Sequence, residues 1–386
     1  MTKSKKVFWL IYLFGFFWAF AGALPAYIQS SYLEQFTGIR FVGLYWTLST
    51  VVTLLAIYFF PRVIRRFGNY RVTLVVLWTL FFSALVLSQS TNRWVALAAF
   101  VFYVVPLDLL AINSDIFLKH ITGVGATGRV RTIFLTFINI AWLCAPFLMG
   151  HIAASESYAP VYLVAAAAVI PAILIIMSQR TALRDGTHYQ SRHWRDLLQI
   201  FKSNHNLSKI FQVAFFLNFF YCVMVLYTPI YLHQYLGFSW TEIGVMFTVM
   251  LLPFVALEFP AGSLADRYWG EQEILVVGLL IMAVSTGAIF FIQSSHFIVW
   301  TVILAMTRIG AALVEAMQDV YFFKNVRKQD MDLIDLFRDI RPAAWLCGSL
   351  FSVIVLEFFA IHYLYLFLAA LLFFGLRAAL TLKDTK

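Results

Sequence analysis

The sequence predicts an all-α membrane protein with twelve transmembrane helices, arranged as two parallel six-helix repeats. Three observations lead to this prediction. Of the 386 residues, 62% are hydrophobic and only 12% are charged, a balance far from that of soluble domains. Apolar runs of about 20 residues, each long enough to cross a bilayer as a helix, follow one another along the chain. The second half of the chain also repeats features of the first half.

The apolar runs are too long for the strands of a transmembrane barrel and lack their alternating polar face, so helices are the predicted elements. A basic segment after the sixth run divides the chain into an N-terminal bundle (1–178), a linker (179–209) and a C-terminal bundle (210–386). The expected spans cover residues 7–29, 41–61, 71–90, 94–118, 130–152, 158–178, 210–232, 240–262, 273–293, 297–320, 342–360 and 361–382.

The linker contains apolar residues at helical spacing among basic ones, namely Trp194, Leu197, Leu198 and Phe201. This pattern predicts an amphipathic helix that lies in the membrane surface. A linker without such a helix is the alternative interpretation.

Lys and Arg predict the orientation, because basic loops resist translocation. With both termini in the cytoplasm, 25 of the 28 basic residues lie there, and only Arg40, Arg93 and Arg308 do not. The net charge of +9 is then explained by topology and by an anionic inner leaflet. A nucleic-acid partner is therefore not expected. We expect a monomeric, multi-pass protein of the lipid bilayer, in a bacterial inner membrane.

Several features recur in the same order at an offset of 201 to 204 residues. The tetrapeptide AWLC occurs at residues 141–144 and again at 344–347. Because each half holds six spans, an even number, the two copies enter and leave on the same side and are expected to be parallel. The matched positions are Pro25 with Pro229, Gly43 with Gly244, Gly68 with Gly270, Asp115 with Asp319, and Trp142 with Trp345.

The segment "GSLADRYWGEQEIL" at residues 262–275 resembles the signature loop of the major facilitator superfamily. The corresponding first-half loop at residues 61–71 departs from the pattern, because Pro61 stands at the first glycine and Arg65 at the aspartate. Residues 145–150, "APFLMG", are similar to part of the antiporter motif of this family. The resemblance extends over the chain through the helix count, the repeat and the signature loop, whose matching residues are Gly262, Leu264, Ala265, Asp266, Arg267 and Gly270.

The resemblance implies a secondary transporter in which two six-helix bundles rock against each other, and signature loops that dock on the opposite half as a cytoplasmic gate. Asp266 is then expected to meet Arg129 or Arg131. The first-half loop has its sign reversed, so Arg65 and Arg66 are expected to meet Asp339. In the alternative interpretation these charges only anchor the helix ends at the membrane surface. The other residues assigned to the gate are Asp115, Gly262, Arg267, Gly270, Asp319 and Arg341.

Few ionisable residues lie inside the expected spans, where each costs at least about 2.5 kcal/mol. Arg308, Glu315 and Asp319 are spaced 7 and 4 residues apart and therefore share one helix face. Asp108 and Asp115 repeat the spacing of 7. The resemblance implies that the spans with Asp108 and Arg308 line the central cavity.

We expect Asp108 to carry a coupling proton, with Glu315 as the second choice, and Arg308 to be its counter-ion or a clamp for an anionic substrate. A static ion pair between the two spans, or an Arg308 contact within its own half, is the alternative. The cavity walls are expected to include Trp18, Asn218 and Tyr221, which lie near the middle of their spans.

The glycine-rich segment at residues 123–130 lacks the Lys-Ser/Thr pair of a nucleotide-binding loop, and no constellation of nucleophile, base and metal ligands is present. No enzyme, cofactor or metal site is therefore expected. The predicted function is proton-coupled export of a small amphipathic or drug-like molecule. Two alternatives stay open: a proton symporter that takes up a sugar or an organic anion, and a sensor or scaffold that keeps a transporter fold without transporting.

Overall fold

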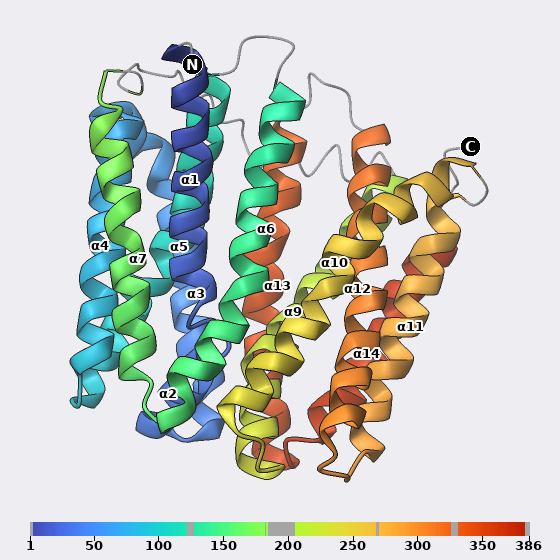
Figure 1. The fold of residues 1–386 in the computed structure, drawn as a ribbon. Coiled ribbons are helices and arrows are strands. Elements are labelled where there is room, and N and C mark those ends of the chain that lie inside the picture. Colours follow the sequence, from blue (N-terminus) through green and yellow to red (C-terminus); the bar gives the residue numbers. More distant parts are fainter. Residues whose placement is uncertain are drawn as a thin grey trace. The chain divides into compact units, whose positions relative to one another are not determined.

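The computed structural model describes residues 3–121, 127–181, 183, 205–267, 270–325 and 331–382. This part of the chain is helical and contains no strand. The helices, drawn in Figure 1, are α1 (Lys3–Ala23), α2 (Gln29–Thr37), α3 (Ile39–Phe67), α4 (Asn69–Gln89), α5 (Arg93–Ile121), α6 (Thr127–Ile152), η1 (Ala153–Ser155), α7 (Ala159–Ser178), α9 (His205–Ile230), the π-helix η2 (Tyr231–Tyr235), α10 (Trp240–Arg267), α11 (Glu271–Phe291), α12 (Phe297–Asn325), α13 (Met331–Phe358) and α14 (Tyr363–Leu380).

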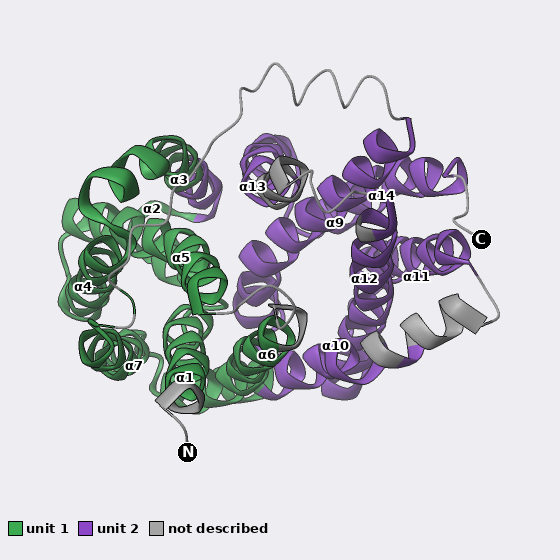
Figure 2. Ribbon diagram, turned by 90° about the horizontal axis from the view of Figure 1, so that it is seen from above, with its two compact units in different colours: residues 1–38, 48–190, 239–244 green, residues 39–47, 191–238, 245–386 purple. Residues whose placement is uncertain are grey.

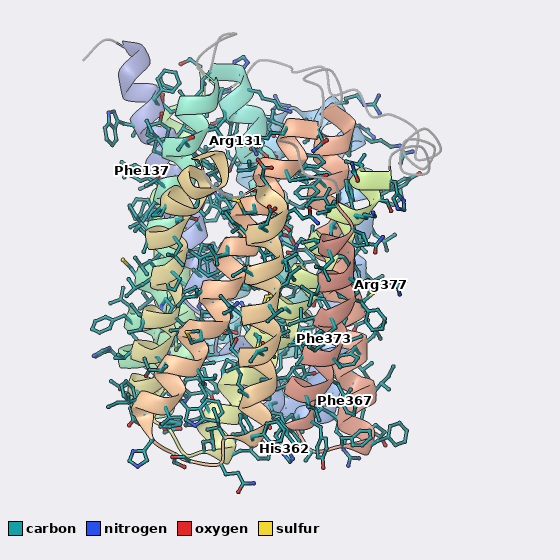
Figure 3. All side chains as sticks on the ribbon, turned by 90° about the vertical axis from the view of Figure 1, so that its right-hand side faces the viewer. Arg131, Phe137, His362, Phe367, Phe373 and Arg377 are labelled. Carbon is teal, nitrogen blue, oxygen red and sulfur yellow. The ribbon has the colours of Figure 1, made fainter. Side chains whose placement is uncertain are left out.

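Eleven helices in the described part are long and apolar enough to cross a membrane, and Val7–Ala23 is a shorter apolar helix at the first expected span. The predicted all-α membrane architecture is therefore confirmed. Many large apolar side chains are exposed, as expected where lipid covers them. Phe373 on α14, labelled in Figure 3, is one of them. The expected amphipathic helix around Trp194 lies outside the described residues.

The first expected span, residues 7–29, is wrong at its C-terminal end. Helix α1 ends at Ala23, and residues 24–28 form a turn that leads into α2. Pro25 explains the break, because proline has no backbone N–H and keeps the preceding residue out of the helical region. Helix α2 is held by Tyr32, whose hydroxyl donates to the Leu87 carbonyl at 3.0 Å. Burial raises the pKa of Tyr32 to about 12, so the donor stays protonated at neutral pH.

The structure consists of two compact units, coloured separately in Figure 2. Unit 1 comprises residues 1–38, 48–190 and 239–244. Unit 2 comprises residues 39–47, 191–238 and 245–386. Each unit therefore contains most of one expected bundle together with the first residues of a helix, α3 or α10, from the other half of the sequence.

The two units share one packing scheme. In unit 1, α4 packs against α5 and α7, and α1 packs against α5, α6 and α7. In unit 2, α11 packs against α12 and α14, and α9 packs against α12, α13 and α14. When the spans are counted within each half of the chain, these are the same pairs of neighbours. The common scheme is what the sequence duplication predicts.

Two glycines matched by the repeat each lie against a helix backbone. A Cβ added at Gly43 would lie 2.7 Å from the Ser349 carbonyl oxygen in unit 2. A Cβ added at Gly244 would lie 2.6 Å from the Pro146 carbonyl oxygen in unit 1. Ser349 and Pro146 are separated by the same 203 residues as Trp345 and Trp142. The repeat therefore preserves a close helix contact that only a residue without a side chain permits.

Candidate functional site in unit 2

Arg308 on α12 is the most deeply buried cation in the described part of the chain, with 2% of its surface exposed. Its guanidinium lies 5.3 Å from the ring centroids of both Phe220 and Tyr221 on α9. Within the described residues, Arg308 forms no ion pair, and its Nε atom has no hydrogen-bond partner. Ring contacts attract a cation, but they leave the planar donor edge of the guanidinium free. Arg308 is therefore able to bind an acceptor or an anion.

Glu315 lies two turns along the same helix and is held by the same tyrosine. The Tyr221 hydroxyl donates to Glu315 Oε2 over 2.6 Å. The positive charges of Arg308 and Arg341 both act on this carboxylate. Tyr221 thus contacts the acid through its hydroxyl and the base through its ring, and the three side chains form what we call the Arg308 cluster.

Helix α13 adds a second cation beside an aromatic ring. Arg341 lies 5.8 Å from the ring centroid of Trp345, and Trp345 lies 5.3 Å from the Trp46 ring in a tilted arrangement. The Trp345 carbonyl accepts a contact from the Cys222 thiol at 3.5 Å, which joins α13 to α9. The side of α13 that carries Arg341 and Trp345 thereby extends the aromatic and cationic surroundings of Glu315.

Of the three expected cavity residues, Tyr221 is part of the Arg308 cluster, and Asn218 and Trp18 are not. Asn218 is half-buried, and its Nδ2 donates to the Ala214 carbonyl one turn earlier, at 2.8 Å. Trp18 is buried on α1 of unit 1, and its indole Nε1 has no hydrogen-bond partner among the described residues. The roles of Asn218 and Trp18 as cavity walls stay predictions.

Asp108 and Asp115 lie on α5 of unit 1. Asp108 is half-buried two residues after Pro106, which is inside the helix. Asp115 Oδ1 lies 3.9 Å from Nη2 of Arg131 on α6, a residue labelled in Figure 3. Both residues are assigned to the gate from sequence without being paired, and the structure brings them together. The role of Asp108 in proton coupling stays a prediction.

The other gate residues divide into described and undescribed side chains. Arg65, Arg66, Asp319 and Arg341 are exposed, and Gly270 is the buried N-cap residue of α11. Asp339, the expected partner of Arg65 and Arg66, and Asp266, the expected partner of Arg129 or Arg131, lie outside the described side chains, so the gate pairings stay predictions. The undescribed side chains are those of Arg129, Gly262, Asp266, Arg267 and Asp339.

Two residues near the cluster are not among the site residues predicted from the sequence. Gln318 on α12 is buried, and its Oε1 has no hydrogen-bond partner in the described part of the structure. It stands three residues after Glu315, so helical spacing was an available signal, but an uncharged amide drew no attention. Trp345 was used as a repeat marker and not as a site residue. Its ring contact with Arg341, four residues earlier on the same helix, was also available from the spacing.

Residues 7–334 match the family profile described as the Major Facilitator Superfamily. No curated protein matches the chain significantly. Among solved structures, the crystal structure of a point mutant of the nucleoside transporter NupG is similar, with a TM-score of 0.76. The alignment covers 97% of this chain and 99% of that chain at 13% sequence identity. At this identity, the likeness concerns the fold alone.

Proposed function

The chain belongs to the major facilitator superfamily and is a transporter rather than an enzyme, and from this premise we propose that it couples a proton to a small amphipathic substrate. In this proposal the protein alternates between two states that expose one binding site to opposite sides of the membrane. The Arg308 cluster in unit 2 binds both the substrate and the proton.

The hydrogen bond from Tyr221 to Glu315, beside the buried Arg308, is the observation that carries the proposal. A substrate acceptor that binds Arg308 neutralises part of its positive charge. The ionised form of Glu315 then loses electrostatic support, and proton binding becomes more favourable. Substrate and proton binding are linked in this way. We assign the proton to Glu315 rather than to Asp108, the first choice from sequence, because Tyr221 donates to Glu315 and the charges of Arg308 and Arg341 act on its carboxylate.

The amphipathic character of the substrate follows from the composition of the site. The half-buried Tyr221 and Trp345 present aromatic surface, while Arg308 supplies a hydrogen-bond donor without a partner in the described part. A molecule with one flat apolar part and one acceptor group fits such a mixture. Export is the proposed direction, on the basis of the partial likeness of residues 145–150 to the antiporter motif.

Proton-driven uptake of an organic anion is the second candidate function. The specific observation in its favour is that the buried Arg308 forms no ion pair with a described carboxylate. A bound carboxylate or phosphate would supply the missing negative charge and the planar acceptor that a guanidinium prefers. An uncharged sugar would accept a hydrogen bond from Arg308 but would not balance its charge.

A ligand screen on purified full-length protein at two pH values tests the proposal, because binding to the folded state raises the unfolding temperature. Each hit is then followed in proteoliposomes with an imposed pH gradient. Glu315→Gln should abolish gradient-driven movement of the hit, whereas the control Glu273→Gln, an exposed carboxylate on α11, should not. If transport by the wild-type protein does not depend on the pH gradient, proton coupling is contradicted. A ligand that binds but is never moved favours the sensor or scaffold alternative.

A further inference from the structure

A cavity of about 340 Å³ lies in unit 1, where α3 turns into α4. Its walls are Phe67, Gly68, Tyr70, Arg71, Leu74 and Arg180. These residues come from the C-terminal end of α3, the first turns of α4, and the residues that follow α7. Helix α4 packs against α7, so the two sides of the cavity belong to one packed structure. None of these residues is part of the Arg308 cluster. Four of them, Phe67, Gly68, Tyr70 and Arg71, belong to the first-half loop at residues 61–71, next to the expected gate residues Arg65 and Arg66.

The cavity walls carry two arginines and no acidic residue. Arg71 and Arg180 contribute exposed guanidinium groups, and neither forms an ion pair within the described residues. No Asp or Glu occurs between Glu34 and Asp108, so α3, α4 and the turn between them carry only positive charge. The guanidinium of Arg66 adds to this charge, because it lies 5.3 Å from the ring of Phe67. Two guanidinium groups at one cavity favour an anion with several acceptor oxygens.

The cavity also lies where the apolar spans end. Phe67 is the last residue of one candidate span, Asn69 begins the next, and Arg180 follows Ser178, the last residue of a third. Further along α4 and α7 toward the membrane interior, large apolar side chains are exposed, among them Val75, Trp78, Leu174 and Met177. An anion that binds at the cavity therefore has an apolar surface directly beside it.

We propose that this cavity binds the phosphate headgroup of an anionic phospholipid. Arg71 and Arg180 contact the phosphate oxygens, the Tyr70 side chain lies at the cavity wall, and the acyl chains run along the exposed apolar residues of α4 and α7. Gly68 has a φ of 81°, and a Cβ added there would meet no atom within 4 Å, so the cavity is open at this turn. The positive end of the α4 helix dipole adds a favourable field, but the two arginines and the cavity carry the inference.

The adjoining apolar surface favours the phosphate of a lipid over a soluble phosphate. The following experiment distinguishes the two. Full-length protein is purified in detergent and titrated with phosphatidylglycerol, with phosphatidylcholine, and with inorganic phosphate or glycerol 3-phosphate. Bound lipid is counted by native mass spectrometry, and the unfolding temperature is measured in parallel. We expect phosphatidylglycerol to bind and to raise the unfolding temperature, and phosphatidylcholine and the soluble phosphates to have much less effect.

The test variant and the control variant each remove two positive charges, but from different parts of the protein. Arg71→Gln with Arg180→Gln should weaken phosphatidylglycerol binding by about 10- to 30-fold, since one basic residue near an anionic surface contributes about a factor of five. Arg62→Gln with Arg93→Gln is the control, because both arginines lie on neighbouring aromatic rings outside the cavity. Binding in this control should equal that of the wild type.

Three results would overturn the proposal: equal weakening in the control pair, equal binding of phosphatidylcholine, or soluble phosphates that bind and stabilise as well as the lipid. If the Gln pair fails to fold, Arg71→Lys with Arg180→Lys takes its place. Lysine keeps both charges but loses the planar two-point contact. Weaker phosphatidylglycerol binding by the Lys pair supports the proposal, and unchanged binding contradicts it.

Discussion

Tyr221 on α9 donates a 2.6 Å hydrogen bond to Glu315 on α12, while the ring of the same tyrosine lies 5.3 Å from the guanidinium of Arg308. One side chain therefore contacts both the carboxylate and the guanidinium of the site. Any movement of α9 relative to α12 changes the surroundings of both charges together. This is the physical basis on which substrate and proton binding can be linked within a single unit.

Tyr221→Phe removes the hydroxyl donor and keeps the aromatic ring beside Arg308. A hydrogen bond to a charged group contributes about 1.5–3 kcal/mol, so gradient-driven transport should fall by about 10-fold or more. Substrate binding should change less, because the ring contact remains. Transport in proteoliposomes and ligand-induced stabilisation measure the two effects. Tyr363→Phe on α14 is the control, and a Tyr221→Phe protein that transports like this control would contradict the assigned role.

Arg308→Met separates a functional role of the buried cation from a structural one. Methionine is unbranched and apolar, and it adapts to the space of the arginine stem. Because Arg308 forms no ion pair within the described residues, its replacement breaks no such pair and removes the cost of keeping a cation out of water. We therefore expect transport to be lost while the free energy of unfolding stays equal or rises.

The double variant Arg308→Met with Glu315→Gln provides the check on this prediction. If Arg308 only balances the charge of Glu315, the single variant should be destabilised and the double variant should regain stability. That pattern, measured by thermal unfolding, would identify a structural ion pair. Loss of transport in a fully stable single variant would support the substrate clamp.

The helices were predictable from the sequence because the length of an apolar run is a local property. The end of the first span was not predicted, because the apolar run continues past Pro25 and only this proline marks the break in the helix. The repeat was predictable for the same local reason, as Gly43 and Gly244 keep their register. The close approach of each glycine to a carbonyl oxygen was not predictable from the sequence, because it depends on how whole helices pack.

The site was predictable only in its parts. Arg308, Glu315 and Tyr221 were each selected from sequence, since charged groups in apolar spans are rare and tyrosines near the middle of a span can line a cavity. Their contacts were not predicted, because Tyr221 and Glu315 are 94 residues apart and their meeting depends on how α9 and α12 are rotated. Gln318 and Trp345 were passed over for a different reason: a neutral side chain gives little signal in an apolar sequence.

Gly244→Ala tests the helix contact that the repeat preserves. Alanine in an open helix position is more favourable than glycine by about 1 kcal/mol. At Gly244, however, the new Cβ would lie 2.6 Å from the Pro146 carbonyl oxygen and 2.9 Å from Gly150 Cα. The backbones must separate, so we expect a lower unfolding temperature and slower transport. Gly43→Ala should act in the same direction.

The control for the glycine contact is Gly287→Ala on α11. There the added Cβ would meet only the Ala369 Cβ, at 3.3 Å, which a small shift relieves. Its unfolding temperature should stay close to that of the wild type. A Gly244→Ala protein that is as stable as Gly287→Ala would show that the contact between α6 and α10 is not close enough to require glycine.

Lys324→Met tests the ion pair between Lys324 at the end of α12 and Glu271 at the start of α11. Glu271 is only 1% exposed, whereas Lys324 is 43% exposed, and a hydrogen bond to a charged group contributes about 1.5–3 kcal/mol. We expect a fall of this order in the free energy of unfolding, measured with purified protein. Lys324→Met with Glu271→Gln should regain part of the loss, since glutamine carries no charge that must be kept out of water. If the single and double variants are equally unstable, the lysine contributes through the packing of its stem rather than through its charge.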